Sequence, residues 1–463
     1  MPCFGHLAFL TDDNLIARLV LPLTLVLASG AFARGVEPAP ARIPAAPPAL
    51  ASDGLDERRP LPVPEPTEKA LRYYRTGNWI WAFDEVWDLV LMAALLFTGA
   101  SAALRDRANR LARGLARPFS GKPDGPAVWF FTIGMYAVLY TALLYLIDLP
   151  LAYAQGFVRP HAYGLSNQTL GRWFGNSLKS LLVAMAVGFL FTWVPYLVLA
   201  RCPKRWWLYT TLLVIPFLFF GMLVTPVLID PMFNHYGPMK NPALEAKIRT
   251  LAARAGIDGG RIYEVNKSVD TKAVNAYVKG FLGTKRIVLY DTLLAKLEDK
   301  EVIAVMAHEM GHYVLGHVSR SILLSSIVIL ASLFAVDRLG RRLIGRFSVR
   351  FRFDRLSDVA SVPLLVGLMQ LTALVLSPVA LAYSRGQEHE ADRFALELTQ
   401  TNRSAALAFA KLQKENLSNP WPGPFYQLWR STHPSIGERI TFCNQYHPWL
   451  EGRPLVYGRW FRP

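Results

Sequence analysis

Cysteine is scarce in this chain, which contains only Cys3, Cys202 and Cys443 among its 463 residues. Three cysteines this far apart exclude a disulfide framework and a cysteine-based metal site. Acidic residues are also under-represented, because 34 aspartates and glutamates face 50 lysines and arginines, for a net charge of +16. Basic and aromatic residues do not interleave as they do in an RNA-binding surface, so the positive charge does not indicate a nucleic-acid partner.

Apolar sequence, by contrast, is abundant, at 52% of the residues. Six apolar runs have about the 20 residues that a helix needs to cross the hydrocarbon core of a bilayer. They lie at about 86–104, 127–147, 181–200, 207–229, 319–336 and 361–382. We therefore expect a mainly α-helical, polytopic membrane protein that is surrounded by membrane lipid, with about six spans.

The N-terminal residues 1–33 are typical of a secretory signal, with an apolar run after Arg18 and a small-x-small cleavage site at Ala31–Ala33. The alternative is an uncleaved first transmembrane helix. A Pro/Ala-rich linker follows at 34–80. The rest divides into transmembrane helices at 81–229, a catalytic segment at 230–318, a transmembrane hairpin at 319–383 and a C-terminal catalytic segment at 384–463.

The segment between the fourth and fifth apolar runs has soluble character. Its hydrophobic periodicity predicts an amphipathic helix over 241–256, and alternating stretches at 261–266 (RIYEVN) and 285–294 (KRIVLYDTLL) predict strands. This mixture of helix and strand leads directly into the most informative motif of the chain.

That motif is HEMGH, from His308 to His312. Each helical residue turns the chain by about 100°, so two histidines four apart project from one face, about 6 Å apart, and can bind one metal ion. Glu309 then lies beside an open coordination position. The alternative is an amphipathic helix whose histidines make ordinary contacts, and His317 is expected to be such a residue because its spacing puts it on another face.

A second cluster, EHEAD at Glu388 to Asp392, offers the third protein ligand that a catalytic zinc requires. Glu388 and Asp392 share a helix face, so we expect Glu388 to bind the metal and Asp392 to accept a hydrogen bond from the distal nitrogen of a histidine ligand. Glu390 points away, and both it and His389 are expected to be solvated. The apolar run at 361–382 returns the chain to the HEMGH side, and its helical continuation can deliver the carboxylate.

These motifs, together with HPSIGERI at 433–440, resemble the type I CAAX prenyl protease family of integral-membrane zinc metallopeptidases. Sequences within 149–174, at 230–239 (DPMFNHYGPM) and at 275–294 resemble the same family in the same order. The similarity covers about residues 70–450. It implies a small α+β, zincin-like catalytic domain inserted between transmembrane helices, one Zn²⁺ per chain, and a peptide or protein substrate.

Carried over residue by residue, the resemblance implies that His308, His312 and Glu388 bind the zinc. Asp392 would accept a hydrogen bond from the distal nitrogen of one of the histidine ligands. Glu309 would act as the general base for a water whose pKa the metal lowers to about 7, and would later pass the proton to the leaving amine.

The resemblance also assigns residues to the substrate cleft. Asn275, Ala276 and Tyr277 would belong to an edge strand that pairs with extended substrate. His433 and Arg439 would line the cleft and stabilise the tetrahedral oxyanion. From the sequence alone, a histidine followed by proline favours a turn residue, so the role of His433 rests on the resemblance.

Charge in the loops departs from the family pattern. The loops at 105–125, 201–206 and 337–360 contain six, three and seven basic residues, against three in 148–180. By the positive-inside rule the first three loops are cytoplasmic. The catalytic segment would then face the periplasm of a bacterial inner membrane, whereas eukaryotic relatives face the cytosol.

The substrate expectation follows from this orientation. A periplasmic site has little access to prenylated cytosolic C-termini, and RPHAYGL at 159–165 differs from the acidic loop of the family. We therefore expect an endopeptidase that acts on membrane-associated or misfolded proteins or peptides, with CAAX prenyl-protein processing as the alternative.

Two other classes of protein fit the sequence less well. A non-catalytic membrane chaperone or clearance factor with structural zinc is disfavoured by the intact Glu309. An intramembrane protease is disfavoured because Lys296, Glu298, Asp299 and Lys300 precede HEMGH and belong at or above the interface. Two histidines and one carboxylate can also hold iron, but a base directly after the first histidine favours zinc. The sequence does not indicate an oligomeric state.

Overall fold

The computed structural model describes residues 56–119, 125–257, 261–279 and 286–462, so the expected signal segment lies outside the described residues. The helices are α2 (Glu68–Phe97), α3 (Ala100–Ala116), α4 (Pro126–Tyr153), α5 (Arg159–Ala162), α6 (Leu170–Phe191), α7 (Trp193–Arg201), α8 (Trp206–Val224), α9 (Pro242–Arg254), α10 (Asp291–Lys296), α11 (Asp299–Val314), α12 (His317–Phe351), α13 (Val362–Thr399), α14 (Asn402–Glu415), α15 (Pro424–Trp429) and α16 (Ile436–Gln445). The strands are β1 (Tyr236–Gly237), β2 (Arg261–Val265), β3 (Ala276–Lys279) and β4 (Arg286–Tyr290).

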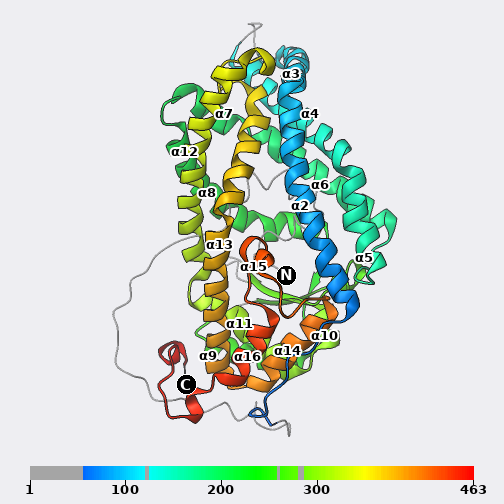
Figure 1. Ribbon diagram of the computed structural model, residues 1–463, viewed down its shortest axis with the longest axis vertical. Helices are drawn as coiled ribbons and strands as arrows, with labels where there is room; N and C mark the ends of the chain where they lie inside the picture. Colours follow the sequence, from blue (N-terminus) through cyan, green and yellow to red (C-terminus); the bar gives the residue numbers. More distant parts are fainter. Residues whose placement is uncertain (1–55, 120–124, 258–260, 280–285, 463) are drawn as a thin grey trace.

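The described chain is mainly helical, and its long helices can cross a membrane. Five stretches of 27 to 41 residues are long and apolar enough, and there are six if the bent pair α2 and α3 counts as one span. The five are Pro126–Ala162, Leu170–Arg201, Trp206–Met232, His317–Phe351 and Val359–Thr399. This agrees with the expected number of spans. Figure 1 shows α2, α12 and α13 running along the long axis, with α9, α11, α14 and α16 gathered at one end.

The first span differs from its expected bounds. Helix α2 begins at Glu68, capped by the Thr67 side chain, which accepts a hydrogen bond from the Ala70 amide, so the linker expected to reach residue 80 is shorter. The helix ends at Phe97 instead of continuing to 104. Gly99 then adopts a left-handed conformation with φ of 71°, which glycine tolerates at no steric cost, and α3 departs at 66°.

The residues just before α2 pack on the C-terminal catalytic segment. Glu57 accepts hydrogen bonds from the Ser404 amide at 3.0 Å and the Ser404 hydroxyl at 2.6 Å. The Leu61 backbone exchanges two hydrogen bonds of 2.9 Å with the Asn444 side chain. This part of the expected linker is therefore an ordered strap that ties the first membrane helix to α14 and α16.

The basic loops converge at the end of the molecule away from the catalytic elements, as Figure 1 shows for α3, α7 and the adjoining end of α12. Arg105 of α3 forms a 2.5 Å ion pair with Asp358 in the α12–α13 connection. Trp206, at the start of α8, donates a 2.6 Å hydrogen bond to Asp337 of α12. The loop charges that the orientation argument counts thus lie on one side of the helical region.

The catalytic segment contains a four-stranded sheet of order β1-β2-β4-β3. Strands β2 and β4 pair in parallel, and β3 pairs antiparallel with β4, with Ala276 opposite Leu289. The predicted strands appear at RIYEV and RIVLY, but DTLL forms the short helix α10 instead of extending β4. The Asp291 side chain accepts a 2.9 Å hydrogen bond from the Thr292 amide, a local contact that favours a helix start over a strand.

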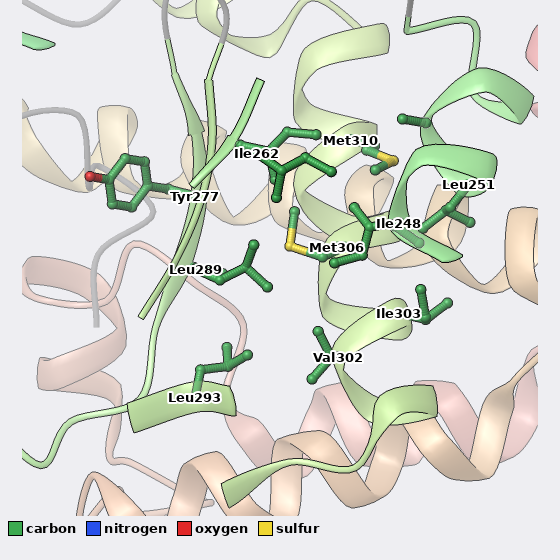
Figure 2. Packing of buried hydrophobic residues seen from close by; sticks show 14 of the residues in the cluster. Ile248, Leu251, Ile262, Tyr277, Leu289, Leu293, Val302, Ile303, Met306 and Met310 are labelled. Carbon is green, nitrogen blue, oxygen red and sulfur yellow. The ribbon is translucent and has the colours of Figure 1, made fainter. Parts of the chain in front are cut away.

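One face of α11 packs on this sheet and forms the core of the catalytic segment. Val302, Met306 and Met310, spaced at four residues, are at most 1% exposed, and Met306 points toward Leu289 of β4 (Figure 2). Burying the apolar surface of each such side chain contributes about 1.5 to 3 kcal/mol. The core holds α11 in a fixed rotation and turns its histidines toward α13.

Candidate metal centre

Gly311, the glycine of HEMGH, lets α11 and α13 approach closely. A Cβ atom at this position would lie 3.2 Å from the Cα atom of Ala391 and 3.2 Å from the Phe394 side chain. Helix α13 is continuous from Val362 to Thr399, as expected, so the last membrane span and the EHEAD cluster form one rod. The close packing brings the carboxylates of that cluster opposite the histidines of α11.

Three side chains from the two helices form a group that could hold a metal ion: His308, His312 and Glu388. The Nε2 atoms of the two histidines are 3.1 Å apart. Glu388 Oε2 is 3.2 Å from His308 Nε2, and Glu388 Oε1 is 3.3 Å from His312 Nε2. Glu388 is only 2% exposed. The structure thus brings together the three residues that the sequence analysis grouped, in an arrangement consistent with a metal site.

The donor atoms and their spacing fit zinc. A tetrahedral zinc with nitrogen and oxygen ligands at about 2.1 Å keeps those atoms about 3.4 Å apart, close to the observed separations. Glu388 Oε2 is buried and has no hydrogen bond of acceptable geometry among the described residues, so it keeps a lone pair for a cation. Two imidazoles and one carboxylate leave a fourth position open, which is typical of a catalytic site.

Asp392 contacts His308 as expected from the spacing, with its Oδ1 atom 2.8 Å from His308 Nδ1. Arg439 of α16 forms a two-point ion pair with this carboxylate, at 2.8 Å from Nε and 2.6 Å from the terminal nitrogen. Burial opposes a charge on the His308 ring, but hydrogen bonds to Asp392 and Glu388 outweigh it and raise its pKa to about 9. The pocket therefore attracts positive charge strongly.

His317 and Glu390 take part in the site, contrary to the expectation that both are bystanders. His317 Nδ1 lies 2.9 Å from His312 Nδ1, and its Nε2 lies 2.9 Å from Glu390 Oε2. Arg320 donates a 2.6 Å hydrogen bond to the same carboxylate oxygen. The expectation for His317 failed because a helical wheel assumes one continuous helix. Gly316, with φ of 65°, ends the helical path between α11 and α12, and this turn brings His317 back toward His312.

His389 also differs from the expected solvated residue. Its ring packs against that of Phe442 of α16, tilted by 55° at a centroid distance of 4.4 Å, and lies 3.3 Å from a guanidinium nitrogen of Arg393. These contacts lie on the side of α13 that packs against α16, so the expectation failed because the sequence did not show where α16 would dock.

A cavity of about 550 Å³ opens onto the metal-binding group and is lined by His308, Glu309, Arg439 and His433. His433 Nε2 is 3.3 Å from Glu388 Oε2, so the structure brings the HP motif to the site. Burial raises the pKa of Glu309. Burial also lowers the pKa of His433 to about 3, which leaves this ring neutral at ordinary pH.

The predicted edge strand borders the same cavity. Strand β3 is at the end of the described sheet, and Asn275 and Ala276 line the cavity wall. Tyr277 does not, because its side chain is 4% exposed and its hydroxyl lies 3.4 Å from that of Tyr236. Figure 2 shows Tyr277 pointing to the opposite side of the sheet from Leu289, so only its backbone can face a peptide at the strand edge.

A polytopic helical fold that joins an HExxH helix to a carboxylate from a second helix defines an integral-membrane metalloprotease. Comparison with known families gives the same class. The sequence model described as peptidase family M48 matches residues 238–446, and the one described as the CAAX prenyl protease N-terminal region with five membrane helices matches residues 62–235. The chain belongs to peptidase family M48, in its CAAX prenyl protease-like branch.

Individual relatives support this membership. A Bacillus subtilis protein named as the uncharacterized metalloprotease YhfN is 34% identical over 82% of this chain and 86% of its own length. CAAX prenyl protease 1 of Saccharomyces cerevisiae is 31% identical over 65% of this chain and 70% of its own. The crystal structure of Ste24p from S. mikatae has a TM-score of 0.66 at 22% identity and covers 95% of this chain and 98% of that one, which shows a common fold.

Proposed function

We propose that this metalloprotease is a zinc endopeptidase that cleaves membrane-associated or misfolded proteins or peptides. The observation that carries the proposal is that His308 of the three-residue ligand group, Glu309 and the edge strand residue Asn275 all line one cavity. An extended peptide that pairs with β3 would lie in the same cavity that Glu309 lines. A zinc ion bound by His308, His312 and Glu388 supplies Lewis acidity toward a carbonyl and acidifies a water.

The roles of the surrounding residues follow from their environment. Glu309 takes the proton of the attacking water and returns it to the leaving amine, and its raised pKa favours this exchange because a weakly basic carboxylate would hold the proton too briefly. Asp392 fixes the His308 ring through its Nδ1 atom, and Arg439 in turn holds Asp392.

His433 is the proposed oxyanion donor. Thr432 Oγ1 lies 2.7 Å from His433 Nδ1, and a hydroxyl that donates to this atom leaves the ring proton on Nε2, which faces the site. Such a donor typically contributes about 10² to 10³ in kcat. Arg439 is engaged with Asp392, so we assign it to positioning Asp392 and to the field at the oxyanion, and His433 to the direct hydrogen bond.

The substrate class rests on orientation. With basic loops on the cytoplasmic side, the cavity would face the periplasm, where unfolded and membrane-bound chains are the accessible substrates. CAAX prenyl-protein processing is the second candidate, because the N-terminal family description and the yeast relative carry that name.

The deciding experiment compares purified wild-type protein with Glu309→Gln for zinc content and for cleavage of casein and of a prenylated CAAX peptide. We expect zinc in both proteins, casein cleavage by wild type, and loss of at least about 10²-fold in the variant. Glu245→Gln, a change on α9 at a partly exposed side chain that does not line the cavity, is the matched control and should cleave normally. Cleavage of the prenylated peptide alone favours the second candidate, and bound zinc without any cleavage favours the chaperone.

A further inference from the structure

Two arginines converge at one end of the cavity that contains the metal-binding group: Arg159 of α5 and Arg430, which follows α15. A Cβ atom built on Gly77 of α2 would lie 3.3 Å from a terminal nitrogen of Arg159 and 3.9 Å from both terminal nitrogens of Arg430. The two guanidinium groups thus face the same small volume, which glycine keeps open.

Neither arginine forms an ion pair with any carboxylate in the described part of the chain. Arg159 donates a 2.8 Å hydrogen bond to the Tyr73 carbonyl oxygen, and its Nε atom is buried without a partner. Arg430 donates to the side chain of Asn78. The pKa of Arg430 is lowered, chiefly by burial, and the positive charge of Arg159 adds to this effect.

Aromatic rings hold both guanidinium groups in place. The Arg159 Cζ atom lies 3.8 Å from the centroid of Tyr73, and the Arg430 Cζ atom lies 5.0 Å from that of Tyr426. These cation–π contacts reduce the motion of the side chains but leave their positive charges uncompensated. Two like charges that are partly withdrawn from water are costly unless an anion joins them.

We propose that Arg159 and Arg430 form a subsite that binds a carboxylate of the peptide substrate. A guanidinium group binds a carboxylate through two parallel hydrogen bonds. Arg159 and Arg430 both line the cavity that also contains Glu309. The proposal deepens the proposed protease function and rests on it. The carboxylate can belong to the C-terminus of the peptide or to an Asp or Glu side chain, and the test separates these sources.

The subsite is close to the reaction centre. Arg430 is three residues from His433, so their Cα atoms are at most about 10 Å apart, and both side chains line the same cavity. A bound carboxylate would therefore belong to a residue only a few positions from the scissile bond. This geometry predicts a preference for short, acid-terminated or acidic peptides over internal neutral sequence.

The first test measures cleavage of one fluorogenic peptide in three forms: free C-terminal acid, C-terminal amide, and amide with a glutamate placed two to four residues from the scissile bond. For wild type we expect kcat/KM for the free acid to exceed that for the amide by about 10-fold to 100-fold, the range of charge-assisted hydrogen bonds. In Arg159→Gln with Arg430→Gln the acid-to-amide ratio should fall to about one. If wild type cleaves the glutamate-containing amide as well as the free acid, an acidic side chain can be the ligand. If wild type cleaves it as poorly as the plain amide, the ligand is the C-terminal carboxylate.

Two controls guard against loss of folding. Arg341→Gln removes a cation at the far end of α12 and should keep the wild-type ratio. Arg159→Lys with Arg430→Lys keeps the charge and should retain part of the preference, while zinc content and thermal unfolding report folding in every variant. A wild-type ratio within twofold of one, without any advantage of the glutamate peptide, overturns the proposal.

The second test does not depend on catalysis. Binding of the fluorescently labelled free-acid peptide to Glu309→Gln is measured by anisotropy, with and without Arg430→Gln. We expect about 10-fold to 100-fold weaker binding when the arginine is removed, and no such change for the amide. If wild type cleaves nothing, the protease proposal fails while this binding difference still decides the carboxylate site; equal binding of the acid, the amide and the glutamate peptide rejects that site even in an active enzyme.

Discussion

The Nδ1 atoms of His312 and His317 lie 2.9 Å apart, so a histidine at the start of α12 contacts the distal nitrogen of a candidate metal ligand. Glu390 lies 2.9 Å from the other nitrogen of His317. His317, held by Glu390, therefore fixes the ring orientation of His312 through its Nδ1 atom, as Asp392 does for His308.

His317→Ala should weaken zinc binding by about 10-fold to 100-fold, because His312 loses the partner that orients its ring. Competition with a chelator of known affinity measures this change. His447→Ala, which removes a histidine paired with Glu451 away from the site, is the control and should bind zinc as wild type does. Equal affinity in both variants would show that His312 needs no support from His317.

Gly311→Ala should destabilise the protein by about 1 to 3 kcal/mol, because the added methyl group meets the backbone of Ala391 across the helix contact. It should also lower zinc occupancy by moving α13 away from α11. Gly386→Ala is the matched control, since a Cβ atom there meets nothing within 4 Å, and should be neutral or slightly stabilising. Thermal unfolding and zinc content of both variants measure the difference; similar melting temperatures would refute the packing argument.

Asp270 should contribute stability that depends on pH. Burial alone would raise the pKa of its carboxyl, but hydrogen bonds from Arg172, one of them 3.1 Å, and from Asn234 at 2.7 Å outweigh it and lower the pKa. A lowered folded-state pKa stabilises the fold above the unfolded value of about 4, and this stabilisation is lost as the pH falls through the folded value.

Asp270→Asn should therefore destabilise the protein by about 1 to 3 kcal/mol at pH 7 and by progressively less as the pH falls below about 4. Thermal unfolding across this range checks the sign. Asp354→Asn, at a side chain that is 85% exposed, should leave the curve unchanged. An Asp270→Asn effect that is constant with pH would contradict the ion-pair explanation.

The orientation of the protein in the membrane can be measured with reporter fusions. Alkaline phosphatase, which is active only outside the cytoplasm, should be inactive when fused after Cys202, between α7 and α8, and active when fused after Lys240, beyond α8. Fluorescent protein fusions at the same positions should give the opposite pattern. Active phosphatase at Cys202 would place the basic loops outside the cytoplasm and the catalytic segment inside it. CAAX prenyl-protein processing would then become the favoured function.

Much of the site follows from local rules. The spacing within HEMGH and EHEAD placed His308, His312 and Glu388 in one group and Asp392 next to a histidine ligand, which the structure identifies as His308. The apolar runs likewise predicted the membrane helices, since a bilayer imposes a minimum length. In both cases the relevant contacts depend on position along a helix.

The contacts that were missed cross between elements. His317 and Glu390 meet only because Gly316 breaks the helix and α13 passes nearby, and no sequence periodicity encodes that approach. The HEMGHYVLGH stretch did contain a signal, a third histidine close behind the motif, but its meaning depended on the break.

The amino-acid sequence by itself determined the membrane helices, the group of candidate ligands and the metalloprotease class, because each depends on residue type and helical spacing. Only the tertiary structure decided where α2 begins, that Tyr277 is a core residue, and that Arg159 and Arg430 face one volume. These features depend on packing between segments far apart in the chain, where shape and desolvation, and not local propensity, select the contact.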